Sequence, residues 1–196
     1  MNYITVFGSS RCNPGDTEYL FAEKIGSLIG QYGYNVATGG YQGTMEAVSK
    51  GASAYDVKVI GVTVPSMFSD KNDKGFERKP NIFINQEIQT ESLSNRIHFL
   101  IENSSAFVVL PGKIGTLTEL FVAWNSVYLY NINENKNVVP IFLKKNFWES
   151  IIKGLPSDIE LDEKFLDYFD LSSVKDLPGV KELKDLGVSV KKINRV

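Results

Sequence analysis

Two glycine-containing segments have the residue types and the placement to bind a phosphate group. Residues 39–43 read Gly-Gly-Tyr-Gln-Gly, and residues 111–119 read Pro-Gly-Lys-Ile-Gly-Thr-Leu-Thr-Glu. Each segment follows a short apolar run and precedes a stretch with helical periodicity. Glycine lets a backbone approach a ligand closely, and the first N–H groups of a helix can bind an anion. For residues 39–43, a tight turn between a strand and a helix is the simpler alternative.

Thr116 and Glu119 have two interpretations. Thr-x-x-Glu is a capping box, in which both side chains bond to N–H groups at the start of a helix and stabilise it by about 1 kcal/mol. A carboxylate beside a phosphate site could also take part in chemistry, and a cap-like position does not exclude that role. The residue types alone favour the cap.

Arg96 precedes Pro111 by 15 residues and lies in a segment with helical periodicity. It flanks an apolar stripe made of Leu93, Ile97 and Leu100, which is predicted to face inward. An arginine beside such a stripe is typical of a solvated or interface position. The pattern alone therefore assigns Arg96 no chemistry.

Strands and helices alternate along the chain, and this alternation predicts how the glycine segments are positioned. The apolar runs that predict strands are residues 4–7, 35–38, 57–64, 81–84, 106–110 and 138–143. The helices are predicted from Asp16 to Gly33, Thr44 to about Ala54, Thr90 to about Asn103, Thr116 onward, and Phe147 to Lys153. Such an order predicts an α/β fold, a doubly wound and mostly parallel sheet of six or seven strands with helices on both faces. Ligands bind beyond the carboxyl ends of such strands, where both glycine segments begin. Pro140 predicts that the last of these strands lies at an edge.

Composition excludes several classes of protein. The 196 residues predict one domain, with 21 Lys and Arg against 23 Asp and Glu, so no basic surplus favours nucleic-acid binding. A single cysteine, Cys12, and a single histidine, His98, exclude an intrachain disulfide and a zinc site built from these residue types. The N-terminus has no leader pattern and no run of about 18 apolar residues occurs, which predicts a soluble, cytoplasmic protein with no membrane partner.

Residues 39–45, residues 111–119 and Arg96 together resemble the Lonely Guy family, once loosely labelled possible lysine decarboxylases. Residues 39–45 are similar to its G-G-G-x-x-G-x-M loop, and residues 111–119 to its P-G-G-x-G-T-x-x-E signature. Arg96 matches the arginine that precedes this signature by the same 15 residues, and residues 6–10 resemble its opening strand and loop. The resemblance covers roughly residues 3–155. It implies a Rossmann-like fold shared with molybdenum-cofactor carrier proteins and with the DNA-processing protein A fold.

The resemblance implies a phosphoribohydrolase that cleaves the N-glycosidic bond of AMP or a modified AMP and needs no metal or redox cofactor. Arg96 and Glu119 would be the catalytic residues, with Glu119 near the ribose. The residues implied in binding the ligand and its phosphate are Gly8, Ser9, Gly39, Gly40, Gly43, Thr44, Met45, Gly112, Lys113, Gly115 and Thr116. The family is commonly dimeric, so a homodimer is expected. No lysine stands in a recognisable pyridoxal-phosphate setting, which argues against a decarboxylase.

Some residues depart from the family pattern and leave a second function open. Lys113 and Tyr41 replace glycines of the two motifs, and Glu46 replaces a small residue after Met45. These changes look closer to the carrier branches of the superfamily, which bind a phosphorylated ligand. The alternative is therefore a non-enzymatic carrier of a nucleotide or phosphorylated ligand. In either case we expect one domain over residues 1–196, with a core at 3–155 and a short helical extension at 156–196.

Overall fold

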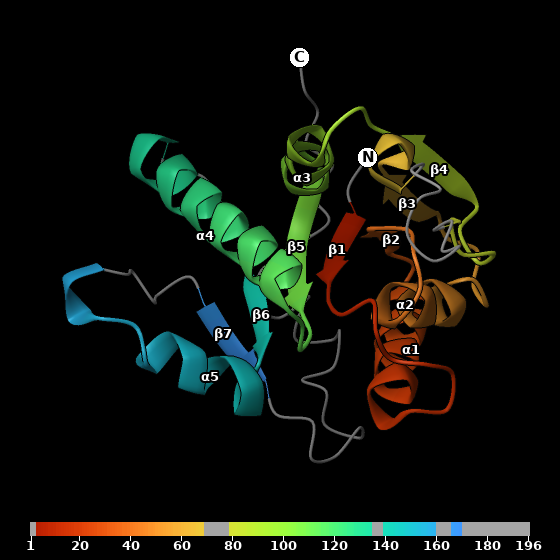
Figure 1. Ribbon diagram of the computed structural model, residues 1–196, viewed down its shortest axis with the longest axis horizontal. Helices are drawn as coiled ribbons and strands as arrows, with labels where there is room; N and C mark the ends of the chain where they lie inside the picture. The colour runs from red at the N-terminus through yellow and green to blue at the C-terminus, as the bar shows by residue number, and fades with distance from the viewer. Residues whose placement is uncertain (1–2, 69–78, 135–138, 160–165, 170–196) are drawn as a thin grey trace.

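A seven-stranded parallel sheet forms the centre of the molecule in the computed structural model, which describes residues 3–68, 79–134, 139–159 and 166–169 (Figure 1). The strand order is β4-β3-β2-β1-β5-β6-β7, and every neighbouring pair is parallel. The strands are β1 (Tyr3–Phe7), β2 (Asn35–Thr38), β3 (Val59–Thr63), β4 (Gln86–Gln89), β5 (Ser104–Val109), β6 (Ile141–Lys144) and β7 (Leu166–Phe169). The predicted α/β, doubly wound, Rossmann-like fold is confirmed.

Helices cover both faces of the sheet, as predicted (Figure 1). They are α1 (Thr17–Gln31), α2 (Thr44–Ala52), α3 (Leu93–Glu102), α4 (Ile114–Glu134) and α5 (Lys145–Lys153), with short 3-10 turns at Pro65–Phe68 and Ser157–Ile159. Helices α1 and α2 pack on one hydrophobic cluster, and α3, α4 and α5 pack on a second cluster across the sheet. The crossover order thus places the loops after β1, β2 and β5 at one edge of the sheet.

Strand β1 shows how the two clusters share one strand. All five of its residues are buried. Ile4 and Val6 face the cluster under α1 and α2, whereas Tyr3 and Phe7 face the opposite cluster, since side chains alternate along a strand. Burial on both faces explains why this strand reads as a continuous apolar run.

Two predictions about strands are wrong. The segment from Asn81 to Ile84 is not a strand, because the Asn81 carboxamide oxygen accepts the Phe83 N–H at 3.1 Å and turns the chain. The fourth strand is instead β4, an edge strand with largely exposed side chains and therefore no apolar signature. The strand after Pro140 does not lie at an edge: β6 runs between β5 and β7, and the Pro140 carbonyl accepts the Phe107 N–H at 2.9 Å. Proline is tolerated there because it stands just before the first residue of β6.

Helix starts and the extension also differ from the prediction. Ser92, not Thr90, caps α3 and accepts the Asn95 N–H at 3.1 Å, while the Thr90 hydroxyl donates to the Thr63 carbonyl. Leu93, predicted to face inward, is 42% exposed at the first position of α3. The extension expected to be helical contributes strand β7 to the sheet. Residues 160–165 and 170–196 of that extension lie outside the described residues.

Trp148 of α5 connects the helix layer to the end of β5. Its side chain is buried, and its indole N–H donates to the carbonyls of Val109 (3.0 Å) and Leu110 (3.2 Å). These carbonyls immediately precede the glycine segment that begins at Pro111. Trp148 therefore holds the point at which this segment leaves the sheet.

We expect Trp148→Phe to destabilise the protein by about 1–3 kcal/mol, because two buried carbonyls lose their donor. Urea unfolding followed by circular dichroism measures this change. An unchanged free energy of unfolding would show that the indole N–H does not hold the end of β5.

Candidate active site

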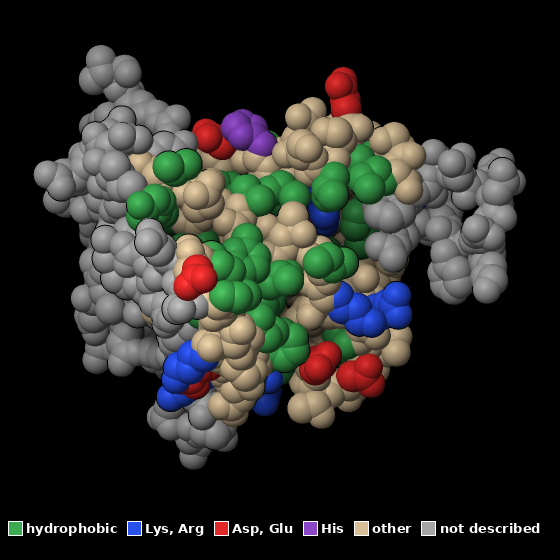
Figure 2. Space-filling model, turned by 60° about the vertical axis from the view of Figure 1, so that its left-hand side comes forward, with side chains coloured by type: hydrophobic (Ala, Val, Ile, Leu, Met, Phe, Trp, Pro, Cys, Tyr) green, Lys and Arg blue, Asp and Glu red, His purple; other side chains and the backbone are tan. Residues whose placement is uncertain are grey.

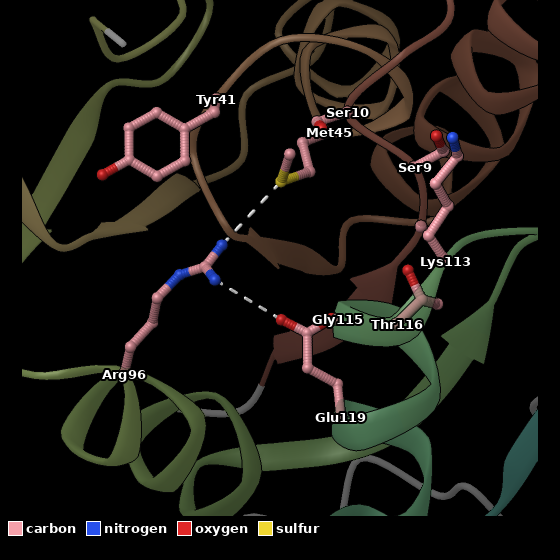
Figure 3. Close-up of a pocket in the computed structure, with 10 residues that line it drawn as sticks. Ser9, Ser10, Tyr41, Met45, Arg96, Lys113, Gly115, Thr116 and Glu119 are labelled. Carbon is pink, nitrogen blue, oxygen red and sulfur yellow. Dashed lines mark hydrogen bonds and ion pairs between the residues drawn. The ribbon is translucent and has the colours of Figure 1, made fainter. Parts of the chain in front are cut away.

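Loops from three strand ends and three helices enclose a pocket at the carboxyl edge of the sheet (Figure 3). Its volume is about 160 Å³. The residues that line it are Gly8, Ser9, Ser10, Tyr41, Met45, Arg96, Lys113, Gly115, Thr116 and Glu119. Both glycine segments therefore meet at one site, as predicted from the order of strands and helices.

Glycines let the loop after β1 lie directly on the start of α2. A Cβ on Gly8 would stand 2.3 Å from the Thr44 hydroxyl, and one on Gly43 would stand 2.4 Å from the Ser9 carbonyl. Gly43 also has a φ of +76°, which disfavours other residue types. The Ser9 carbonyl accepts both the Thr44 N–H (2.8 Å) and the Thr44 hydroxyl (3.0 Å). Thr44 therefore fixes the Ser9 loop instead of directing these donors into the pocket.

The segment after β5 presents the N-terminus of α4 to the pocket. Helix α4 begins at Ile114, so Thr116 is its third residue, and the predicted capping box is wrong. A Cβ on Gly112 would stand 2.1 Å from the Thr116 hydroxyl, so glycine is required for this turn. The Leu117 N–H makes the first bond of the helix, to the Lys113 carbonyl at 3.0 Å. The preceding N–H groups of Gly115 and Thr116 have no acceptor within the helix and can bind an anion.

Arg96 reaches into the pocket from α3. Its Nε donates to the Val62 carbonyl at the end of β3 (2.8 Å), and its Nη1 lies 3.5 Å from Glu119 Oε1. Its side chain is 12% exposed, so the prediction of a solvated position is wrong. Glu119, which the pattern assigned to a cap, ion-pairs with Arg96 across the pocket instead.

Burial controls the ionisation of Glu119. Its side chain is 11% exposed, and burial raises its pKa to about 7, while the charge of Arg96 acts in the opposite direction. A carboxyl with a pKa near neutrality can both accept and release a proton near pH 7. This property fits catalysis better than the capping role.

The pocket brings together most of the predicted site residues. Those that line it are Gly8, Ser9, Met45, Arg96, Lys113, Gly115, Thr116 and Glu119. The predicted residues that shape its loops without lining it are Gly39, Gly40, Gly43, Thr44 and Gly112. Sequence reasoning missed Ser10 and treated Tyr41 only as a departure from the family. Because Tyr41 stands inside the first glycine segment, its position was the signal that could have found it.

No group of three or more metal-ligating His, Cys, Asp or Glu side chains occurs among the described residues. In the same part of the chain, no helix is long and apolar enough to cross a membrane.

Raising the pH from 5 to 8 should destabilise the wild type relative to Glu119→Gln. The pKa of Glu119 is about 7 in the folded protein against an ordinary value of 4.5. Between these values the folded protein retains a proton that the unfolded chain has released, so stability falls as the pH rises. The variant lacks this contribution. Its free energy of unfolding, relative to that of the wild type, should therefore rise by up to about 3 kcal/mol between pH 5 and pH 8.

Unfolding in urea at several pH values measures this difference. Glu149→Gln is the matched control, because that partly exposed carboxyl has its pKa lowered by Lys153 and should not reproduce the trend. A pH-independent difference for Glu119→Gln would contradict the raised pKa.

A family model described as the SLOG cluster4 family matches residues 1–148. The pyrimidine/purine nucleotide 5′-monophosphate nucleosidase of Escherichia coli (strain K12) is 28% identical over 149 residues, which are 72% of this chain but only 30% of that enzyme. The cytokinin riboside 5′-monophosphate phosphoribohydrolase of Mycobacterium tuberculosis is 32% identical over 119 residues, 60% of each protein.

Among solved structures, the molybdenum cofactor carrier protein of Chlamydomonas reinhardtii superposes with a TM-score of 0.67 at 20% identity, covering 95% of this chain and 98% of that one. This likeness shows the fold. The family model covers most of the chain, including both glycine segments, Arg96 and Glu119. The expected relationship to Lonely Guy-like proteins is thereby confirmed, and the chain belongs to the SLOG cluster4 family.

Proposed function

We propose that this chain hydrolyses the N-glycosidic bond of a nucleoside 5′-monophosphate, AMP or a modified AMP, and releases the free base and ribose 5-phosphate. The observation that carries the proposal is the buried Arg96–Glu119 ion pair, which shares a pocket with the N-terminus of α4. The names of the Escherichia coli and Mycobacterium tuberculosis relatives describe the same reaction class. The chain matches only 30% of the length of the Escherichia coli enzyme. The proposed activity therefore rests on the pocket as well as on the names of the two relatives.

The pocket has a side suited to phosphate and a side suited to the sugar. Ser9, Lys113 and Thr116 lie close together in Figure 3, beside the free N–H groups at the start of α4. Arg96 and Glu119 lie across from this group. A 5′-phosphate bound at the start of α4 would direct the ribose toward the Glu119 carboxylate.

Cleavage of the glycosidic bond builds positive charge on the ribose. The C1′–N bond breaks, its electron pair passes to the base, and the base takes up a proton. The oxygen of a water molecule bonds to C1′, and the Glu119 carboxylate stabilises the developing charge and accepts a proton from that water. Since the pKa of Glu119 is raised to about 7, the ionised fraction rises through neutral pH, and the rate should rise with it.

Glu119→Gln should lower hydrolysis by about 10²-fold or more, because the variant loses the negative charge that the transition state requires. The measurement is release of free base from a panel of nucleoside monophosphates, separated by chromatography. Inorganic phosphate should still bind, since it is held at the start of α4. Glu149→Gln, which removes a carboxylate outside the pocket, should retain full activity. Equal rates for wild type and Glu119→Gln would contradict the proposed role.

The second candidate function is a carrier that binds a phosphorylated ligand without cleaving it. Lys113 favours this alternative, because it places an exposed ammonium beside the start of α4 where the family signature has a glycine. If the wild type binds a nucleoside monophosphate but releases no free base from any nucleotide of the panel, the carrier function is supported.

We propose that the chain forms a homodimer through α4. Apolar residues of this helix remain exposed, among them Ile114 (76%), Val122 (40%) and Leu129 (48%). Figure 2 brings this side of the molecule forward and shows hydrophobic side chains exposed across it. Exposed apolar patches of this kind mark interfaces.

Light scattering at micromolar concentration should give a mass of about twice the 21.9 kDa of one chain. Val122→Lys should shift the protein toward the mass of one chain, because a charge in a buried apolar contact opposes association. A mass of one chain for the wild type would contradict the dimer.

A further inference from the structure

Arg96 is held from several directions within the pocket. Besides the bond from Nε to the Val62 carbonyl, its Nη2 donates to Met45 Sδ at 3.9 Å, and its guanidinium carbon lies 5.8 Å from the centre of the Tyr41 ring. Figure 3 shows Tyr41 and Met45 on one side of the guanidinium and Glu119 on the other. A guanidinium over an aromatic face is attracted by the ring's negative quadrupole. The Tyr41 ring therefore stabilises the Arg96 cation.

Tyr41 is itself rigidly placed. It is only 3% exposed, and its hydroxyl oxygen accepts the Val64 N–H at 2.9 Å. Its backbone is held by Asn81, whose carboxamide N–H groups donate to the carbonyls of Gly40 (3.0 Å) and Tyr41 (3.2 Å). The Asn81 backbone N–H also donates to the Gly40 carbonyl, at 2.8 Å. These bonds fix the ring at both of its ends.

The guanidinium leaves no spare room on its Met45 side. A Cβ on Gly39 would stand 1.6 Å from Arg96 Nη2, so the guanidinium occupies the space of a side chain at that position. Gly39 provides this space and Tyr41 provides the attractive surface beside it. A glycine at position 41, as in the family motif, would supply no such surface.

We propose that Tyr41 is a positioning residue that fixes the Arg96 guanidinium opposite Glu119 and acts on Glu119 through Arg96, without contacting the reacting atoms. Its consequence for hydrolysis rests on the proposed function, but its effect on Arg96 and Glu119 does not.

Tyr41 acts on the pKa of Glu119 through the position of the Arg96 charge. The charged groups that line the pocket with it are Arg96 from α3 and Lys113 from the loop before α4, and Tyr41 is the remaining titratable group. Arg96 lowers the pKa of Glu119 against the effect of burial. Without the Tyr41 ring, the guanidinium would spend less time beside Glu119, and this pKa would rise.

The test is a ¹³C NMR titration of the Glu119 carboxyl in glutamate-labelled protein, with the signal assigned by its absence in Glu119→Gln. In Tyr41→Met the bulk is kept and the aromatic face is lost, so the midpoint should rise by about half a pH unit to one unit. In Tyr41→Phe the face is kept, so the midpoint should stay at the wild-type value even if loss of the bond from Val64 lowers the melting temperature. Tyr41→Leu replaces the methionine variant if circular dichroism shows that the latter does not fold.

Tyr34→Phe and Tyr34→Leu form the control pair, because Tyr34 is also buried and does not line the pocket. They should leave the Glu119 midpoint unchanged. An unchanged midpoint in a folded Tyr41→Met or Tyr41→Leu, or an equal rise in Tyr41→Phe, would overturn the proposal. The titration needs no substrate, so it tests the role of Tyr41 even if no nucleoside monophosphate is cleaved. Where cleavage occurs, the acidic limb of the pH–rate profile should move with the midpoint.

Discussion

The ion pair between Arg96 and Glu119 determines how the rest of the pocket is built. Both side chains are almost completely buried, and removing two charges from water costs more free energy than a 3.5 Å contact alone returns. The surrounding residues offset this cost. The Val62 carbonyl, the Met45 sulfur and the Tyr41 ring satisfy the guanidinium. Glu119 receives less help, and its raised pKa is the result.

The sheet supplies the fixed points from which this pair is held. Val62 lies near the end of β3 and Val64 directly follows it, while the carbonyls of Val109 and Leu110 lie at the last residue of β5 and directly after it. Trp148 from α5 bonds to the β5 end, and Arg96 from α3 bonds to the β3 end. Two helices on the same face of the sheet therefore hold the ends of β3 and β5 in place, and the pocket lies between these two strand ends. The glycine segments complete it because their backbones pack more closely than side chains would allow.

On the proposed function, the pocket combines a rigid anion site with a carboxylate whose pKa is raised to about 7. The N–H groups at the start of α4 are set by the helix and need no movement to bind phosphate. The ionisation of Glu119 depends on a balance between burial and one neighbouring cation. Residues that place this cation, with Tyr41 as the clearest case, can therefore tune the chemistry without touching the phosphate. Such a division lets substitutions like Gly to Tyr alter reactivity while ligand binding is kept.

Local sequence patterns were sufficient for the framework and for the location of the site. The alternation of apolar runs and helical segments predicted the parallel sheet, and the glycines after β2 and β5 predicted where its loops would meet. These features follow from the hydrophobic pattern and the turn chemistry of neighbouring residues, which one sequence carries directly. The polar edge strand β4 was not predicted, because its largely exposed side chains form no apolar pattern.

The roles of individual side chains were decided by tertiary packing. From the residue patterns alone, Arg96 looked solvated and Glu119 looked like half of a capping box. Only the resemblance to the Lonely Guy family implied that both are catalytic. Helix α4 begins two residues before Thr116, which removes the box, and the packing of α3 against β3 brings Arg96 to a carbonyl 34 residues earlier in the chain. The distance between two charges on different helices depends on how those helices cross the sheet. No local pattern encodes that distance, and so the ion pair, the buried carboxyl and the aromatic support from Tyr41 emerged only from the folded structure.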